Sequence, residues 1–176
     1  TDEGAQRIDE RLSVTSPSGA GRRLDVTDDE DVTGLLKEIT KTFGAPTIVV
    51  NNAAIGPLGT ILDTDPSLFE RILEVNLKGP YLLCRAAIPH MAATGGGRIV
   101  NVGSGAGWGK PNMAGYSTSK GGLSALTTAI ALDHFADGIS ANLVIPGGGG
   151  IVSGMSLGRV SGDMEKLQAK AVGTVA

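Results

Sequence analysis

Short apolar runs rich in β-branched residues alternate with longer segments of helical periodicity along this chain. The expected strands are residues 22–26, 46–51, 98–102 and 139–145, and the expected helices are residues 5–12, 27–44, 66–93 and 114–134. Alternating strands and helices predict a doubly wound parallel sheet with helices on both faces, a three-layer α/β/α arrangement. No repeat or internal boundary breaks the pattern, so we expect a single domain over residues 1–176.

The helix ends and one helix interior carry more specific signals. Thr27 and Glu30 have the spacing of a capping box, with Thr27 as N-cap, and Gly44 is placed to end that helix. In the long helix, Asn76 interrupts an apolar face and Pro80 follows four residues later. Because proline has no N–H, the Asn76 carbonyl loses its helical partner, and we expect the helix to bend there.

Each expected strand ends in glycine or small polar residues. These ends are residues 25–26, 51–54 (NNAA), 103–107 (GSGAG) and 146–150 (PGGGG). In open parallel sheets, ligands bind beyond the carboxyl ends of the strands, so four such ends predict a long ligand lying against backbone. The alternative is that strands must turn and that turns use these residues. That alternative explains one end better than it explains four.

Composition and charge exclude several classes of protein. A net charge of −3 gives no basic surface for nucleic acid, and no apolar run is long enough to cross a bilayer. The single cysteine, Cys84, rules out an internal disulfide and fits a reducing compartment, so we expect a cytoplasmic protein. His90 and His134 have no metal-ligand spacing near them, and we expect no metal site.

Five motifs in order resemble those of the short-chain dehydrogenase/reductase family. Residues 51–54 (NNAA) resemble its NNAG motif, residues 116–120 (YSTSK) match its YxxxK signature, and Ser104 lies where its catalytic serine would. Asn76 matches the family's helix asparagine, and residues 146–147 match its PG. The resemblance implies a Rossmann-like fold and an NAD- or NADP-dependent enzyme that interconverts a carbonyl and an alcohol. The 3-oxoacyl-acyl-carrier-protein reductases and broad ketone reductases look most similar.

The chemistry of the signature pair can be reasoned from its spacing. Tyr116 and Lys120 are four residues apart and share a helix face. Across roughly 4 Å at an effective dielectric constant of about 20, an ammonium contributes on the order of 4 kcal/mol toward a phenolate, before desolvation. Since one pKa unit takes about 1.4 kcal/mol, lowering the tyrosine pKa into the working range is feasible. The alternative is an ordinary exposed pair at helical spacing.

The resemblance implies a role for each of four catalytic residues. Tyr116 would exchange the proton of the reacting oxygen, and Lys120 would lower its pKa and bind the nicotinamide ribose. Ser104 would hydrogen-bond the reacting oxygen. Asn76 would hold a water in a proton relay from Lys120. As alternatives, Ser104 is a turn serine and Asn76 a structural cap of the bend. A serine nucleophile is not expected, because G-x-S-x-G is not met around Ser104.

The cofactor residues are likewise implied by position. Asp25 would contact the adenine amino group beside Val26, and the NNAA motif would line the adenosine ribose. The segment after residue 145 would flank the nicotinamide. The implied cofactor residues beyond the catalytic pair are Asp25, Val26, Asn52, Ala53, Ala54, Pro146, Gly147, Ile151 and Ser153. Suggested substrate walls, for which ordinary packing is an equal alternative, are Trp108, Met113 and Met155.

The sequence departs from the family pattern at both ends. It has no TGxxxGxG or GxGxxG loop to hold a pyrophosphate at a helix N-terminus, and the family's closing helix and strand are not apparent. We therefore expect a fold truncated at both ends that binds a dinucleotide poorly. The PGGGG segment is also longer than the usual PG-x-I-x-T, and aligning Ile151 and Ser153 requires about two inserted glycines.

Three functional readings remain open. An oxidoreductase acting on a small-molecule carbonyl or alcohol is favoured because all four catalytic positions are filled. A catalytically inactive fragment that serves as a binding or oligomerisation module is favoured by the missing loop. A related dehydratase or epimerase is disfavoured by the compact spacing. Because only a narrow stripe of the long helix is polar, that helix is expected to bury two sides, one of them against a second subunit in a homodimer or homotetramer.

Overall fold

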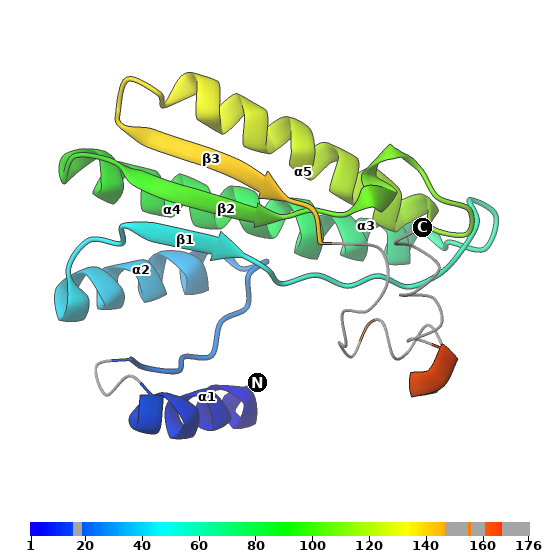
Figure 1. The fold of residues 1–176 in the computed structure, drawn as a ribbon, viewed down its shortest axis with the longest axis horizontal. Coiled ribbons are helices and arrows are strands. Elements are labelled where there is room, and N and C mark those ends of the chain that lie inside the picture. Colours follow the sequence, from blue (N-terminus) through cyan, green and yellow to red (C-terminus); the bar gives the residue numbers. More distant parts are fainter. Residues whose placement is uncertain (16–18, 147–154, 156–160, 167–176) are drawn as a thin grey trace.

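The computed structural model describes residues 1–15, 19–146, 155 and 161–166. These form a parallel three-stranded sheet in the order β1-β2-β3, with helices beside it (Figure 1). The elements in chain order are α1 (Asp2–Thr15), α2 (Asp29–Phe43), β1 (Ile48–Asn51), α3 (Pro66–Leu73), η1 (Glu74–Lys78), α4 (Gly79–Ala93), β2 (Gly97–Val102), η2 (Gly105–Trp108), α5 (Ala114–Asp133) and β3 (Ile139–Val144).

One face of the sheet carries the core. Val49, Ile99 and Ala141 lie side by side in register across the three strands, and the first two are buried. Helices α2, α4 and α5 lie against this face (Figure 1). Their apolar side chains complete one continuous core, whose helical members include Val32, Leu36, Leu82, Ala87, Met91 and Ile130. The expected Rossmann-like class, a parallel sheet flanked by helices, is confirmed.

The opposite face differs from the expected third layer. Ile48 and Val50 of β1 are 64% and 56% exposed, and Val144 of β3 is 49% exposed. In Figure 1, α1 lies to one side of the sheet and not over this face. Among the described residues, the second helical layer is therefore not formed.

Residues 22–26 do not form the expected strand. They run as irregular backbone into a turn at residues 26–27, and the sheet ends at β1. Asp25 N–H donates to a carboxylate oxygen of Asp31 at 2.7 Å instead of to a neighbouring strand. A β-prone segment needs a partner strand for its backbone groups, and in the described residues β1 does not supply one to this segment.

The N-cap of α2 is Asp28, so the expectation of Thr27 and a capping box with Glu30 is wrong. The Asp28 carboxylate accepts from the backbone N–H groups of Glu30 at 2.9 Å and Asp31 at 3.2 Å. A carboxylate is the stronger acceptor at a positive helix N-terminus. Thr27 instead donates its hydroxyl to Asp25. Gly44 ends the helix as expected, with φ 88°.

The long helix between β1 and β2 is interrupted where Asn76 and Pro80 predict it. It continues from α3 through one wide turn, η1, into α4. Proline cannot supply the N–H that would close the normal ladder, so the backbone widens at the turn that holds Asn76. The backbone is irregular at the position where a bend was expected, and the irregularity takes the form of this widened turn.

Candidate active site

Ser104 and the tyrosine–lysine pair come from adjacent elements at the carboxyl edge of the sheet. Ser104 follows β2 and caps η2, where its Oγ accepts from the Ala106 N–H at 3.1 Å. Tyr116 and Lys120 occupy the first two turns of α5. Their side chains are 6% and 4% exposed, so both lie in the interior and not on the solvent face of the helix.

Two glycines let η2 and α5 touch through their backbones. A Cβ on Gly107 would lie 3.1 Å from the carbonyl carbon of Lys120, and one on Gly121 would lie 3.0 Å from the Gly107 oxygen. No side chain separates the loop that begins at Ser104 from the turn of α5 that carries Lys120. The spacing between these two elements is therefore set by backbone contact.

The Lys120 ammonium points to the strand that leads to Ser104. Nζ donates to the carbonyl oxygen of Val102 at 2.7 Å and lies 5.8 Å from the centroid of the Tyr116 ring. Burial lowers the pKa of Lys120 to about 8 because removal from water disfavours its charged form. A buried ammonium at this place adds positive charge beside the phenol ring.

Asn76 is fully buried and uses its whole carboxamide. Its Oδ1 accepts from the Ile55 N–H at 2.8 Å, and its Nδ2 donates to the Ile55 carbonyl at 2.8 Å and to Ser119 Oγ at 3.0 Å. The side chain therefore ties the loop after β1 to α5. A buried amide of this kind needs such partners.

A second polar chain lies beneath the site and was missed by the sequence reasoning. Asn51 Nδ2 donates to Asn101 Oδ1 at 2.7 Å, and Asn101 Nδ2 donates to Thr127 Oγ1 at 2.8 Å. Asn51 Nδ2 also lies 3.4 Å from Cys84 Sγ. The available signal was the asparagine at an inward position of each apolar strand, since a buried amide must be paired.

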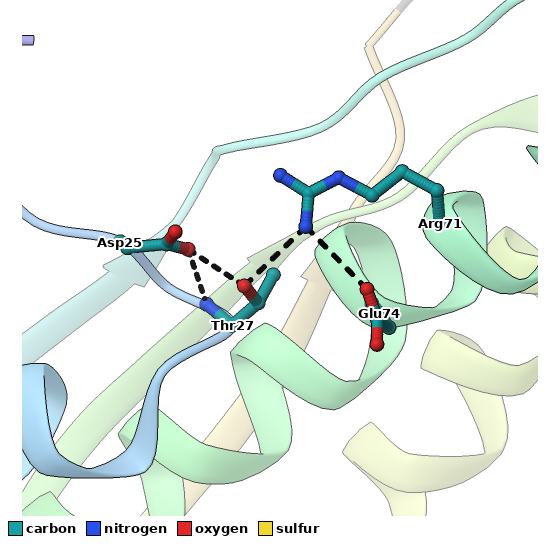
Figure 2. A network of polar contacts seen from close by, with 4 residues as sticks. All are labelled: Asp25, Thr27, Arg71 and Glu74. Atoms are coloured by element: carbon teal, nitrogen blue, oxygen red, sulfur yellow. Dashed lines mark hydrogen bonds and ion pairs between the residues drawn. The ribbon is translucent and has the colours of Figure 1, made fainter.

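The expected adenine end of a cofactor site contains an exposed network (Figure 2). Asp25 Oδ1 accepts from the backbone N–H and the hydroxyl of Thr27 at 2.9 and 2.7 Å. Arg71 of α3 reaches Thr27 Oγ1 and Glu74 at 3.4 Å each. The bonds from Thr27 hold the pKa of the Asp25 carboxyl below its ordinary value, so it stays ionised.

The remaining expected cofactor residues differ in their exposure, and some lie outside the described residues. Val26 packs against α4, where a Cβ on Gly79 would come within 3.0 Å of Val26 Cγ2. On the loop after β1, Asn52 and Ala53 are exposed and Ala54 is half-buried, and Pro146 after β3 is half-buried. Outside the described residues lie Gly147, Ile151 and Ser153.

Of the suggested substrate walls, Trp108 is 77% exposed, while Met113 and Met155 are half-buried. Met113 precedes α5 in a segment paired with the loop after β1, through Gly59 N–H to Asn112 O at 2.9 Å. That pairing brings a second loop to the N-terminal end of the helix that carries Tyr116.

The described part of the chain lacks two other features. It holds no group of three or more histidine, cysteine or acidic side chains arranged to bind a metal ion. No helix in that part is long and apolar enough to span a membrane.

Comparisons with known proteins all point to the same family. The sequence model described as short chain dehydrogenase matches residues 1–156. The 2-(R)-hydroxypropyl-CoM dehydrogenase of Xanthobacter autotrophicus is 39% identical over 129 residues, which are 71% of this chain and 52% of that protein. The 3-oxoacyl-acyl-carrier-protein reductase FabG of Pseudomonas aeruginosa is 35% identical over 145 residues, 82% of this chain and 59% of that protein.

The structure of an NAD+-bound xylitol dehydrogenase superposes with a TM-score of 0.83 at 32% identity, covering 97% of this chain and 64% of that one. Parallel strands whose loops meet a helix bearing Tyr116 and Lys120 define a Rossmann-like α/β domain of the oxidoreductase type. The chain belongs to the short-chain dehydrogenase family. It spans about half the length of the curated relatives that it matches.

Proposed function

We propose that this chain carries the acid–base centre of an NAD- or NADP-dependent oxidoreductase that interconverts a carbonyl and an alcohol. The observation that carries the proposal is the burial of Tyr116 and Lys120 on one helix, with the lysine ammonium 2.7 Å from the carbonyl of Val102, two residues before Ser104. A buried ammonium whose acceptor is a backbone carbonyl, in a site beside a phenol, is uncommon, because burial of charge is costly. Buried groups with a perturbed pKa are typical of sites that perform acid–base chemistry.

Each of the four residues has a distinct role in this proposal. Tyr116 gives a proton to the substrate oxygen during reduction and takes it back during oxidation. Lys120 stabilises the phenolate form of Tyr116 by its charge. Ser104 already accepts from Ala106, which leaves its hydroxyl proton to donate to the substrate oxygen as negative charge develops there. Asn76 holds the loop after β1 against α5.

The cofactor would supply or accept the hydride. The fit of the present residues to its adenosine end rests on the ionised Asp25 carboxylate, of which only Oδ1 is used by Thr27. Asn52 and Ala53 are exposed on the neighbouring loop, within the same edge of the sheet. Nothing in these residues distinguishes NAD from NADP, and a small ketone or secondary alcohol is the proposed substrate class.

The pyrophosphate is the part of the cofactor that this sequence does not hold by a glycine-rich loop. The 176-residue chain should therefore bind NAD or NADP weakly, whereas a protein with such a loop ahead of residue 1 should bind well. Titration of both proteins with each nucleotide by calorimetry tests this expectation. Equal affinity of the two proteins would contradict it.

The direct test of the activity is hydride transfer to a panel of ketones, followed by the absorbance of the reduced nicotinamide. Wild type is compared with Tyr116→Phe, which removes only the phenol hydroxyl, and with Ser117→Ala as a control on the same helix. The proposal predicts loss of turnover in Tyr116→Phe alone. Unchanged turnover in Tyr116→Phe would remove that residue from the mechanism.

A second candidate function is a non-catalytic binding or oligomerisation module, favoured by an apolar groove on α3, η1, α4 and α5. It is lined by Leu73, Leu77, Tyr81, Gly122 and Leu126, with Glu74 and Lys78 at its edge. A second copy of this chain is the proposed occupant, because the groove is apolar and carries one acidic and one basic side chain, Glu74 and Lys78, which make the surface self-complementary in charge. Both functions are compatible with a homodimer or homotetramer.

Sedimentation of wild type and Leu77→Glu measures the oligomer. The proposal predicts that the variant becomes monomeric, while a monomeric wild type would refute it. Absence of hydride transfer from a wild type that does oligomerise would favour the module over the enzyme. One domain over residues 1–176 is part of this proposal, supported by the continuous core that runs from Leu24 to Ala141. A cytoplasmic location is likewise proposed, supported by the single free thiol, Cys84.

A further inference from the structure

Two buried asparagines hold helix α5 at two hydroxyl groups. Asn76 Nδ2 donates to Ser119 Oγ at 3.0 Å, and Asn101 Nδ2 donates to Thr127 Oγ1 at 2.8 Å. The asparagines come from η1 and β2, on separate elements. The two hydroxyls are eight residues apart, which is about 12 Å along the helix axis. Both hydroxyls donate to backbone carbonyls, Ser119 Oγ to that of Tyr116 and Thr127 Oγ1 to that of Leu123.

The direction of each hydrogen bond is fixed by the partners on either side. Ser119 and Thr127 donate their own protons to the carbonyls of Tyr116 and Leu123, at 2.8 and 2.6 Å. Their oxygens can then only accept from the asparagine. The Oδ1 of Asn76 is taken by the Ile55 N–H, so its Nδ2 must face α5.

The second asparagine is oriented in the same way. Asn101 Oδ1 is taken by Asn51 Nδ2 at 2.7 Å, so the Nδ2 of Asn101 must face Thr127. Asn101, Ser119 and Thr127 are 0%, 0% and 4% exposed. Water cannot replace a lost partner in such a site, and an unpaired buried donor costs about 1–3 kcal/mol.

One contact lies within the proposed acid–base pair, at Ser119 between Tyr116 and Lys120, and the other lies seven residues beyond Lys120, at Thr127. Ser119 bonds to the carbonyl of Tyr116 itself and directly precedes Lys120. Asn101, which binds Thr127, directly precedes Val102, whose carbonyl accepts from Lys120. Consecutive residues of β2 thus hold α5 at two places. These hydrogen bonds add two directional contacts, about 12 Å apart, to the packing of α5 on η2 and β3, and so restrict both its rotation and its position along its axis.

We propose that Ser119 and Thr127 are positioning residues, which hold α5 so that Tyr116 and Lys120 keep their place relative to Val102 and Ser104. This inference rests on the proposed function for its catalytic consequence. Its structural half, the position of the Lys120 ammonium, stands apart from that function and can be measured without turnover.

The test removes one hydroxyl at a time in the full chain, with Ser119→Ala and Thr127→Val. Thr118→Ala is the matched control, because Thr118 Oγ1 donates to the Ala114 carbonyl at 2.9 Å in the same helix but on its exposed face. Thr127→Ser keeps the hydroxyl group and removes only the methyl group. The first readout is the NMR titration of the Lys120 side chain, and the second is the pH dependence of kcat.

The proposal predicts that Ser119→Ala and Thr127→Val both move the Lys120 titration upward, toward that of an exposed lysine, because the ammonium leaves its buried place. It also predicts a loss of kcat between about tenfold and hundredfold with a shifted pH profile, since small misplacements of catalytic groups are costly. Thr118→Ala and Thr127→Ser should keep both wild-type readouts.

Two outcomes would overturn the proposal. A wild-type Lys120 titration in both variants would reduce the two hydroxyls to a structural role, whatever the change in melting temperature. An equal shift of the Lys120 titration in Thr118→Ala would mean that removing any hydroxyl from α5 moves the lysine, whichever face of the helix carries it. If one variant fails to fold, the other tests its own contact independently. A shifted Lys120 titration in a protein without hydride transfer would sustain the positioning role and refute the proposed function.

Discussion

The ammonium nitrogen of Lys120 lies 2.7 Å from the carbonyl oxygen of Val102, inside the protein, and burial lowers its pKa to about 8. The contact joins α5 to the last residue of β2, one residue before the loop that begins with Gly103 and Ser104. A backbone carbonyl solvates an ammonium only in part. The charged form of this lysine is therefore unfavourable for stability.

This burial predicts a rise in stability at alkaline pH. The folded pKa of Lys120, about 8, lies below its ordinary value of 10.5, so between these values the unfolded chain binds more protons. The free energy of unfolding should rise across pH 8 to 10.5 by up to about 3 kcal/mol from this group, and the gain is lost as pH falls through 8. Urea unfolding of wild type and of Lys120→Met at several pH values measures this rise as the difference between the two proteins. If the lysine is in water, the two proteins should show the same pH dependence.

The thiol of Cys84 should act in the opposite direction. Burial raises its pKa from 9.0 to about 11, so the unfolded chain loses its thiol proton first. Stability from this group is complete below pH 9 and is lost as pH rises to 11, by about 2–3 kcal/mol. Cys84→Ala, compared with wild type across pH 8 to 11, should flatten this fall. An identical pH dependence of unfolding in both proteins would refute the assignment.

A methyl group on Gly107 should separate the loop that begins at Ser104 from α5. The added Cβ would lie 3.1 and 3.2 Å from backbone atoms of Lys120 and Gly121, which cannot swing away as a side chain does. We expect Gly107→Ala to destabilise the protein by about 1–3 kcal/mol and to reduce turnover.

Gly105→Ala is the matched control for Gly107→Ala, two residues earlier in the same short helix. A Cβ on Gly105 meets nothing within 4 Å, and its φ is not positive. Chemical denaturation should separate the two variants clearly. Equal stability of the two variants would show that η2 moves freely against α5.

Removal of the Asn76 side chain should be among the costly single changes. Asn76→Ala deletes three hydrogen bonds and leaves the Ile55 N–H without its acceptor in a part-buried loop. We expect a loss of about 2–4 kcal/mol in the free energy of unfolding. The control is Asn52→Ala on the neighbouring loop, where the side chain is exposed and the change should stay within about 0.5 kcal/mol. Equal losses in both variants would contradict the proposed anchoring by Asn76.

Local sequence rules predicted much of the secondary structure. The apolar run at residues 48–51 and the break at Asn76 and Pro80 were predictable because each depends on residues close in the chain. Helix α5 was expected to end at His134 and ends at Asp133. The error at residues 22–26 has a tertiary cause, since a strand exists only when another strand accepts its hydrogen bonds. The N-cap error at Thr27 was local, because two adjacent acceptors compete and the carboxylate of Asp28 wins.

By itself, the sequence determined the order of the main strands and helices after residue 27, the four residues that match the family's catalytic pattern, and the break in the long helix. Only the tertiary structure decided that Lys120 is buried against Val102, that Gly107 and Gly121 touch through their backbones, and that Asn76 and Asn101 bind α5 at Ser119 and Thr127. The physical reason is the separation along the chain of the residues that interact. Periodicity and capping depend on neighbours within a turn or two of the chain, whereas each of these contacts joins residues 14 to 43 positions apart and forms only when the sheet and α5 pack together.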